Sequence, residues 1–178
     1  MLNDVERVLI TEQEIAEKVK EIGEKITNDY QGEQLLIVTI LKGSVVFAAD
    51  LLREIKMPVE IDFMCLSSYG CDSKSSGVVR IVKDLNQPIE GKNVLIIEDI
   101  LDSGNTLSHL TKLLSTRNPK SVKIVTLLDK PERRTTPVEV TYKGFTIPDE
   151  FVVGYGLDYN EKYRNIPFVG VLKREVYE

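Results

Sequence analysis

An apolar run leads directly into acidic residues and a glycine-containing turn between residues 94 and 107, VLIIEDILDSGNTL. Residues 94–97 are continuously apolar, which is typical of a parallel strand covered on both faces. From Leu107 onward, leucines recur at intervals of three and four residues and predict a helix. The acids and the turn are therefore expected where a strand ends and a helix begins, which is where open α/β sheets bind ligands.

The turn at residues 102–106, DSGNT, has the chemistry of a phosphate site. The unpaired amides at a helix amino terminus carry partial positive charge, and Ser103 and Thr106 add hydroxyl donors. A glycine in the turn permits close approach of the backbone. Glu98 and Asp99 would repel a phosphate, but carboxylates suit ribose hydroxyls or a magnesium ion. The combination predicts a site for a ribose phosphate.

Each feature has a simpler interpretation when it is taken alone. Asp102 or Ser103 would cap a helix, and Glu98 and Asp99 would end a strand in solvent. The complete string follows an apolar strand and precedes an amphipathic helix, and this context favours the ligand site.

The remaining segments predict an α/β fold with a parallel sheet. Thr11 and Glu14 have the spacing of a capping box before a helix. Strand, helix and strand follow one another at residues 34–41, 45–55 and 58–66, and a further β-rich run occupies residues 121–128. This succession implies parallel strands joined by helices.

Two other regions are expected to lie outside this core. Residues 67–77 are dense in Ser, Gly, Asp and Lys, and their flanks predict a long hairpin that carries a mobile loop. Before it, Val59, Ile61 and Phe63 alternate with acids, the pattern of a half-buried strand. The tail from Pro137 alternates short strands with turns. We therefore expect a smaller lobe built from the chain ends.

Length and composition fit one ordinary globular domain. The 178 residues are 42% hydrophobic and 29% charged, enough for a substantial core, and no linker is recognisable. A net charge of −5 argues against a nucleic-acid partner, which usually meets a basic surface. The sequence has no signal peptide or membrane span, and Cys65, Cys71 and the single His109 do not make a zinc motif. A cytoplasmic location is therefore expected.

The string at residues 94–107 resembles the phosphoribosyl-diphosphate signature of type I phosphoribosyltransferases, which pairs two acids with Asp-Ser/Thr-Gly-x-Thr. Further segments occur in the order found in hypoxanthine-guanine phosphoribosyltransferases: Leu41-Lys42-Gly43-Ser44, Ser68-Tyr69, Leu128-Asp129-Lys130 and FVVGYGLDYNE at residues 151–161. The similarity spans nearly the whole chain. It implies a single domain over residues 1–178, with a helix-flanked parallel core, a small hood lobe and a mobile active-site loop at residues 67–77.

The resemblance implies how a sugar diphosphate would be held. The two acids Glu98 and Asp99 would hold the ribose hydroxyls, directly or through metal or water. The implied 5′-phosphate site is Ser103, Gly104, the backbone of Asn105, and Thr106. The implied diphosphate site is Lys42, Gly43 and Arg164, with a cis peptide between Leu41 and Lys42. The implied acids around Mg²⁺ are Asp158, Glu98 and Asp99.

The resemblance also implies a base site. Lys130 would donate to the exocyclic oxygen of a 6-oxopurine, and adenine is disfavoured because it presents an amino group there. Phe151 would stack on the base, while backbone groups near Val152 and Asp158 would contact its edge. Asp102 would handle the proton at N7.

Ser68 and Tyr69 on the mobile loop would close over the substrates and exclude water. Taken singly, several of these positions have simpler interpretations: Lys42 and Lys130 as surface lysines, Phe151 as a core residue and Asp158 as a turn residue. The family resemblance favours the functional interpretations.

The implied activity is purine salvage, in which 5-phosphoribosyl 1-diphosphate and Mg²⁺ convert hypoxanthine or guanine to IMP or GMP. One alternative is a regulator that keeps the fold, senses the sugar diphosphate and binds RNA or DNA. Another is the same chemistry on xanthine or a pyrimidine, because Lys130 and Phe151 would serve hypoxanthine, guanine and xanthine alike. The resemblance further implies a homodimer or homotetramer.

Overall fold

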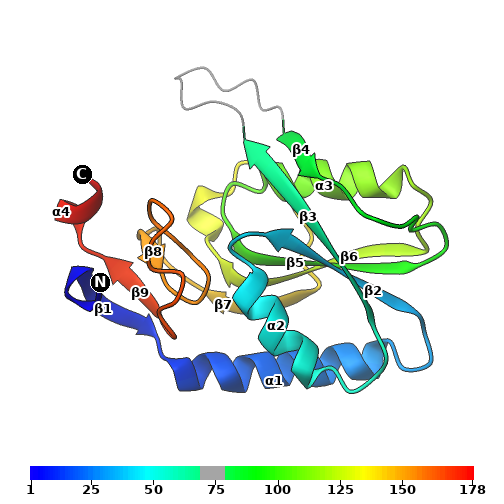
Figure 1. Ribbon diagram of the computed structural model, residues 1–178, viewed down its shortest axis with the longest axis horizontal. Coiled ribbons are helices and arrows are strands. Elements are labelled where there is room, and N and C mark those ends of the chain that lie inside the picture. The colour runs from blue at the N-terminus through cyan, green and yellow to red at the C-terminus, as the bar shows by residue number, and fades with distance from the viewer. Residues whose placement is uncertain (69–78) are drawn as a thin grey trace.

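The computed structural model describes residues 1–68 and 79–178 and contains a six-stranded sheet beside a separate three-stranded sheet (Figure 1). The large sheet has the order β4-β3-β2-β5-β6-β7. Its strands are β2 (Leu35–Leu41), β3 (Glu60–Ser68), β4 (Val79–Lys83), β5 (Asn93–Leu101), β6 (Ser121–Asp129) and β7 (Tyr142–Thr146). Strand β4 pairs antiparallel with β3, and the other pairings are parallel. The predicted α/β core and the predicted hairpin are both confirmed.

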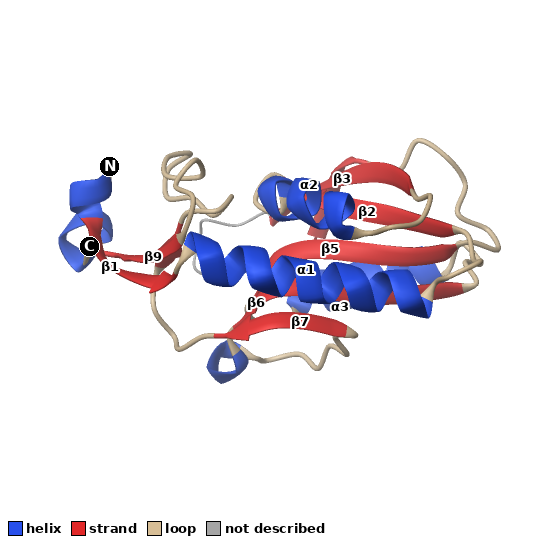
Figure 2. Ribbon diagram, turned by 90° about the horizontal axis from the view of Figure 1, so that it is seen from below, coloured by secondary structure: helices blue, strands red, loops and turns tan. Residues whose placement is uncertain are grey.

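Helices cover both faces of this sheet. Helices α1 (Glu12–Asp29) and α2 (Val45–Glu54) lie on one face, and α3 (Asn105–Ser115) lies on the other (Figure 2). Buried side chains form one apolar cluster on each side of the sheet. Because both faces are covered, the central strands contain continuous apolar runs, and residues 94–97 are completely buried.

Helix α1 forms where its sequence predicts. Thr11 Oγ1 accepts a hydrogen bond from the Glu14 amide at 3.2 Å, and Glu14 Oε2 accepts one from the Thr11 amide at 2.8 Å, which completes the capping box. The helix turns an apolar stripe toward the sheet, and each buried aliphatic side chain in such a stripe contributes roughly 1.5–3 kcal/mol. Among the described residues, no helix combines the length and apolar character needed to cross a membrane.

The small lobe is built from both ends of the chain. Its strands are β1 (Val5–Ile10), β8 (Val152–Val153) and β9 (Val169–Leu172), in the order β1-β9-β8. A short helix, η1 (Leu2–Asp4), precedes this sheet, and α4 (Arg174–Tyr177) follows it, so both termini lie on the small lobe (Figure 1). The predicted smaller lobe is confirmed, except that β7, from the tail expected to form it, pairs with β6 in the large sheet.

Strand β5 is longer than the apolar run predicts. It continues to Leu101, so Glu98 and Asp99 lie within the strand and Asp99 is buried. Helix α3 has Gly104 as its N-cap in place of the expected Asp102 or Ser103. The interpretation that Glu98 and Asp99 end the strand in solvent is therefore wrong, because the neighbouring strand β6 pairs with β5 as far as Leu101.

Strand β3 reverses the expected relation between polarity and burial. Asp62 is buried at 5% exposure, whereas Ile61 is 51% exposed. The Asp62 carboxylate accepts hydrogen bonds from the amides of Phe63 and Asn86, both at 2.7 Å, and lies 3.4 Å from Lys83 Nζ. These partners compensate the buried charge of Asp62. Two of them, Asn86 and Lys83, lie outside β3.

Candidate active site

The predicted signature lines a cavity of about 250 Å³ at the carboxyl ends of β2 and β5. The cavity is bounded by the end of β2, by residues 98–104, and by the first turn of α3 with Thr106 and Leu107. The acid pair and the predicted phosphate turn are therefore brought together in one wall. This arrangement suits a ligand that carries both hydroxyls and a phosphate.

The phosphate turn is held from behind by the segment after β6. The Ser103 carbonyl accepts hydrogen bonds from the amides of Thr135 and Thr136, both at 3.0 Å. Gly104 has φ +87°, and a Cβ there would overlap the Thr136 carbonyl. The turn can thus take its shape only with glycine at position 104.

Arg134 adds a second support to this turn, which the sequence did not predict. Its Nε donates to the Asp102 carbonyl at 3.0 Å, and its guanidinium forms an ion pair with the buried Asp129. Lys143 Nζ lies 3.1 Å from the same carboxylate. The run of charges at residues 129–134 was the available signal, but a charge run does not specify which backbone it contacts.

Glu98 and Asp99 form an acid pair beside the cavity, in which Asp99 is buried and Glu98 is half-buried. Burial raises the pKa of Glu98 well above its usual range, and the neighbouring charge of Asp99 adds to this effect. Burial also raises the pKa of Asp99, whose Oδ1 accepts the Ile100 amide at 2.7 Å. A cation or a set of hydroxyl donors would compensate this pair.

The loop after β2 packs directly onto the acid pair. The Leu41–Lys42 peptide is cis, as the resemblance implies. A Cβ on Gly43 would overlap Asp99 Oδ2, and a Cβ on Gly156 would overlap the Gly43 carbonyl. Gly43 therefore lies between β5 and the small lobe, with no space for a side chain.

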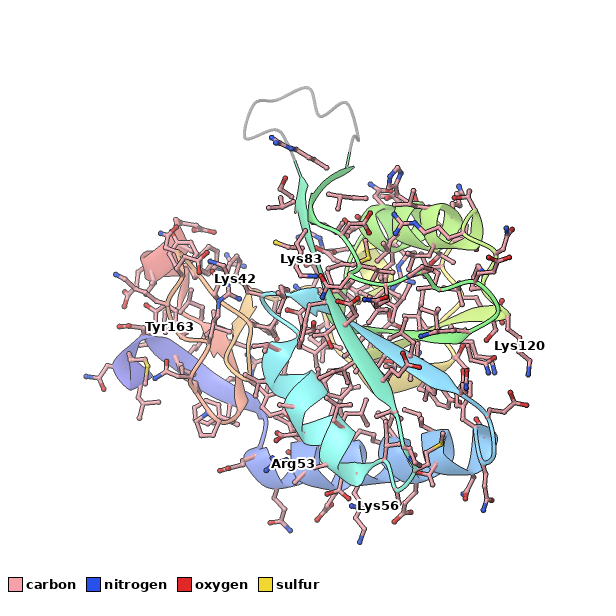
Figure 3. All side chains as sticks on the ribbon, turned by 45° about the vertical axis from the view of Figure 1, so that its right-hand side comes forward. Lys42, Arg53, Lys56, Lys83, Lys120 and Tyr163 are labelled. Atoms are coloured by element: carbon pink, nitrogen blue, oxygen red, sulfur yellow. The ribbon has the colours of Figure 1, made fainter. Side chains whose placement is uncertain are left out.

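Lys42 and Arg164 carry the positive charge of the predicted diphosphate site. Lys42 lies at the junction of the core and the small lobe (Figure 3), and its Nζ is 3.1 Å from Glu161 Oε2. Arg164 Nη2 lies 2.9 Å from Asp158 Oδ1 and 3.4 Å from the same Glu161 oxygen. These cations and acids form one cluster on the small-lobe side. Glu161 belongs to the motif at residues 151–161, but no role was predicted for it.

The predicted metal acids lie in two groups. Glu98 and Asp99 are adjacent on β5, whereas Asp158 contacts Arg164 and the Glu161 amide. Among the residues that the structure describes, no three His, Cys, Asp or Glu side chains form a cluster that would hold a metal. Magnesium often uses one or two carboxylates together with substrate oxygens, so either group fits that chemistry.

The predicted base site combines a buried lysine with an exposed ring. Lys130 is 7% exposed, its Nζ donates to the Glu150 carbonyl at 2.6 Å, and burial lowers its pKa. Phe151 is 37% exposed, which excludes its interpretation as a core residue, whereas Val152 is buried. The Phe151 ring stacks on Tyr177, with centroids 4.7 Å apart and an interplanar angle of 21°.

Two aromatic neighbours of Phe151 were not predicted. Tyr177 comes from α4, and Tyr159 meets the Phe151 ring edge-on at a centroid distance of 5.6 Å. The ring is thereby held although it is exposed. The predicted loop residue Tyr69 lies outside the described residues, as does most of residues 67–77, and Ser68 ends β3.

Asp102 lies between the phosphate turn and the base site. Its Oδ1 is 2.9 Å from Arg133 Nε, and Arg133 ends the short helix η2 (Pro131–Arg133) that follows Lys130. Arg133 is a further residue that the sequence did not predict. His109 is exposed on α3.

The fold and the site define a phosphoribosyl transferase domain. Residues 8–160 match the model of the family described as "Phosphoribosyl transferase domain". The chain belongs to the hypoxanthine-guanine phosphoribosyltransferases of this family, because relatives with that name match it over essentially its whole length.

One such relative, from Bacillus subtilis strain 168, is 54% identical over 178 residues, which cover 100% of this chain and 99% of the relative. Another, from Staphylococcus aureus strain Mu50, is 55% identical over 177 residues and covers 99% of each chain. A bifunctional TilS/HprT protein of Listeria monocytogenes strain F2365 is 54% identical, but this chain spans only 27% of it.

Solved structures agree with this assignment. A crystal structure of a hypoxanthine phosphoribosyltransferase from Staphylococcus aureus has a TM-score of 0.97 and 54% identity, covering 100% of this chain and 97% of the other. The predicted family and fold class are therefore confirmed.

Proposed function

We propose that this chain is a purine salvage enzyme that transfers the 5-phosphoribosyl group of 5-phosphoribosyl 1-diphosphate to N9 of hypoxanthine or guanine. The products are IMP or GMP and diphosphate. The observation that carries this proposal is the adjacency of three features. The phosphate turn and the acid pair line one cavity, and Lys130 of the base site donates its amide to the carbonyl of Leu101 in the same wall. The names of the full-length relatives support the same reaction.

The sugar diphosphate occupies the cavity and its rim in this proposal. The 5′-phosphate lies on the turn at residues 103–106, where backbone amides and hydroxyls donate to it. Glu98 and Asp99 accept hydrogen bonds from the ribose hydroxyls. Lys42, the Gly43 backbone and Arg164 bind the diphosphate, and their charges offset its own.

The acids also fit Mg²⁺. Glu98 and Asp99 are a pair of like charge, and Asp158 lies in the cluster around the diphosphate site. Either the Glu98–Asp99 pair or Asp158 would hold an ion, with substrate oxygens as the other ligands. When bound, Mg²⁺ neutralises charge on the departing diphosphate.

The base is recognised by Lys130, Phe151 and backbone groups at Val152 and Asp158. The Lys130 ammonium donates to O6, which adenine lacks, so the enzyme selects 6-oxopurines. Because the Nζ already donates to Glu150, its direction is fixed before the base arrives. Phe151 supplies a stacking surface without choosing among these bases.

In the transfer step, the bond from C1 to the diphosphate oxygen breaks and a bond from C1 to N9 forms, with inversion at C1. Positive charge develops on the ribose and on the base. Asp102 accepts the proton from N7 and balances the charge of the base. The diphosphate leaves with the electron pair of the broken bond.

The test uses the purified chain with 5-phosphoribosyl 1-diphosphate, Mg²⁺ and one base at a time: hypoxanthine, guanine, xanthine, adenine or uracil. Nucleotide formation is followed by ultraviolet absorbance. Turnover confined to 6-oxopurines supports the proposal and ranks the substrates. The alternative function, a nucleic-acid-binding regulator, is supported by a different result. In that case the protein binds the sugar diphosphate, turns over no base and gives a salt-sensitive gel shift with RNA or DNA.

Assembly and location remain parts of the same proposal. We expect a homodimer or homotetramer in the cytoplasm, with the sugar diphosphate and a 6-oxopurine as the binding partners. Light scattering after size-exclusion chromatography measures the mass of the assembly, and a monomer at micromolar concentration would contradict this expectation.

A further inference from the structure

Asp102 has an unusual relation to Arg133. The Arg133 Nε atom lies 2.9 Å from Asp102 Oδ1, but its N–H direction does not make a hydrogen bond to that oxygen. Asp102 Oδ1 is inaccessible to solvent and accepts no hydrogen bond from the described residues. The guanidinium therefore offsets the carboxylate charge at Oδ1, while the Asp102 side chain as a whole stays accessible to a ligand.

A second nitrogen of the Arg133 guanidinium contacts an acid that precedes β8 of the small lobe. Its Nη1 donates to Asp149 Oδ1 at 3.4 Å, and the same oxygen lies 3.9 Å from Lys130 Nζ. Arg133 thus connects the carboxylate at the phosphate turn with an acid beside the base-site lysine. A guanidinium held by acids on two sides can adopt few rotamers, so the Asp102 carboxylate beside it is held in one orientation.

The ion pair itself adds little to folding. The Arg133 and Asp102 side chains are 52% and 44% exposed, and ion pairs at such positions contribute little to stability. Arg134 differs, because it binds backbone carbonyls and the buried Asp129 and so supports the turn itself. Among the described residues, the ion pairs of the Arg133 side chain join it to two carboxylates at the edge of the base site, Asp102 and Asp149.

We propose that Arg133 is a positioning residue for the transfer step: it holds the Asp102 carboxylate in the orientation that directs it at N7 of the base. This inference rests on the proposed role of Asp102. Removing Arg133 should lower kcat while binding of the sugar diphosphate is preserved, because Arg133 does not line the phosphate cavity.

The experiment compares Arg133→Gln, Arg133→Lys, Asp102→Asn and the double variant Asp102→Asn with Arg133→Gln. We expect Arg133→Gln to lower kcat about tenfold, a part of the roughly 10²–10⁴-fold that a positioned acid or base supplies. KM for the sugar diphosphate should change by less than about twofold. Arg133→Lys should recover part of the loss, because it keeps the charge but not the contacts with both acids.

The double variant gives the decisive comparison. If Arg133 acts through Asp102, the double variant should turn over at the rate of Asp102→Asn alone. Multiplied losses would overturn the proposal, as would a higher KM for the sugar diphosphate at unchanged kcat. Normal turnover of Asp102→Asn would instead disprove the role of Asp102, a separate failure.

Two further variants separate positioning from folding. Arg117→Gln removes an arginine that pairs with Asp84 through both terminal nitrogens, at 2.8 and 2.7 Å, and should leave turnover unchanged. Asp149→Asn keeps Arg133 but weakens its anchor, so kcat should fall about threefold. If Arg133→Gln does not fold, Asp149→Asn decides: unchanged kcat in that variant would count against the proposal.

Discussion

The phosphate turn and the base site are built by different means. The turn at residues 102–106 is fixed by backbone hydrogen bonds from residues 135 and 136 and by a glycine that has no space for a side chain. The base site depends on side chains: Lys130 follows β6 of the large sheet, and Phe151 is exposed and supported by Tyr177 of the small lobe. The backbone of the phosphate turn can adopt only one conformation. The base site, in contrast, can be altered by changing single side chains.

This difference matches the chemistry of the two ligands. A phosphate is the same group in every reaction of this type, so a rigid backbone cradle suits it. Bases differ by single donors and acceptors, and side chains such as Lys130 can distinguish them. Substitutions in the turn should therefore abolish activity, and substitutions in the base site should reduce it by smaller amounts that depend on the contact removed.

The largest effect is expected for Gly104→Ala. The new methyl group would meet the Thr136 carbonyl, and φ +87° is strained for alanine, so the turn must move. We expect turnover to fall by more than about a hundredfold, because a small misplacement of bound groups can cost that much. Steady-state kinetics with hypoxanthine measures it.

Gly32→Ala is the matched control for this substitution. Gly32 has φ +81° and no neighbour within 4 Å of the added Cβ, so it shares the backbone strain without the overlap. It should lower thermal stability slightly and leave kcat unchanged. Equal losses of turnover in the two variants would show that strain alone, and not the cradle, explains the effect.

Lys130→Met should reduce kcat/KM for hypoxanthine by about 30-fold. The change removes a charged hydrogen bond to the base, a contact that contributes roughly 1.5–3 kcal/mol. Affinity for the sugar diphosphate, measured by calorimetry, should be unchanged, because the base site is separate from the phosphate cavity. Lys120→Met is the control, since Lys120 pairs with Glu33 far from the site (Figure 3).

Glu98→Gln should raise KM for the sugar diphosphate about tenfold, through loss of a charged acceptor. It should also stabilise the fold at neutral pH. In the folded protein, burial and Asp99 raise the pKa of Glu98, so the folded state holds this proton more tightly than the unfolded chain. Stability is therefore full below the unfolded pKa and falls as pH rises toward the folded pKa.

Thermal melting from pH 4 to 8 tests the stability part of this prediction. The parent protein should lose melting temperature across that range relative to Glu98→Gln, which has no proton to lose at this position. A variant that melts lower than the parent at neutral pH would show that the Glu98 charge is already compensated in the free protein.

The smallest effect is expected for Tyr177→Ala. It removes the ring that stacks on Phe151, and an aromatic pair contributes roughly 0.5–1.5 kcal/mol. KM for hypoxanthine should rise about threefold with kcat preserved. Tyr177→Phe keeps the stacked ring and should behave as the parent. A loss larger than that of Lys130→Met would mean that the small lobe governs the base site more than its polar contact does.

Much of the core was predictable from local patterns. The capping box at Thr11 and Glu14, the buried strand at residues 94–97 and the apolar stripe of α3 all form as expected. Each of these features depends on residues that are close together in the sequence. Periodicity and capping are local properties, which explains why the sequence is sufficient for them.

The features that the sequence did not predict have a different physical origin. The burial of Asp62 depends on Asn86 and Lys83, more than twenty residues away in the chain. The support of the turn by Arg134 and the contact of Tyr177 with Phe151 also join distant segments. No periodicity encodes such contacts, because they exist only after the sheet and the small lobe have assembled.

The sequence by itself determined the secondary structure of the core and the kinds of group at the site, because hydrophobic periodicity and a short signature are written in consecutive residues. Tertiary structure decided which groups meet. It placed Asp99 against Gly43, Arg133 beside Asp102, and the carboxyl-terminal Tyr177 on Phe151. The physical reason is that burial and charge pairing depend on distances in space, and the fold sets these distances independently of separation along the chain.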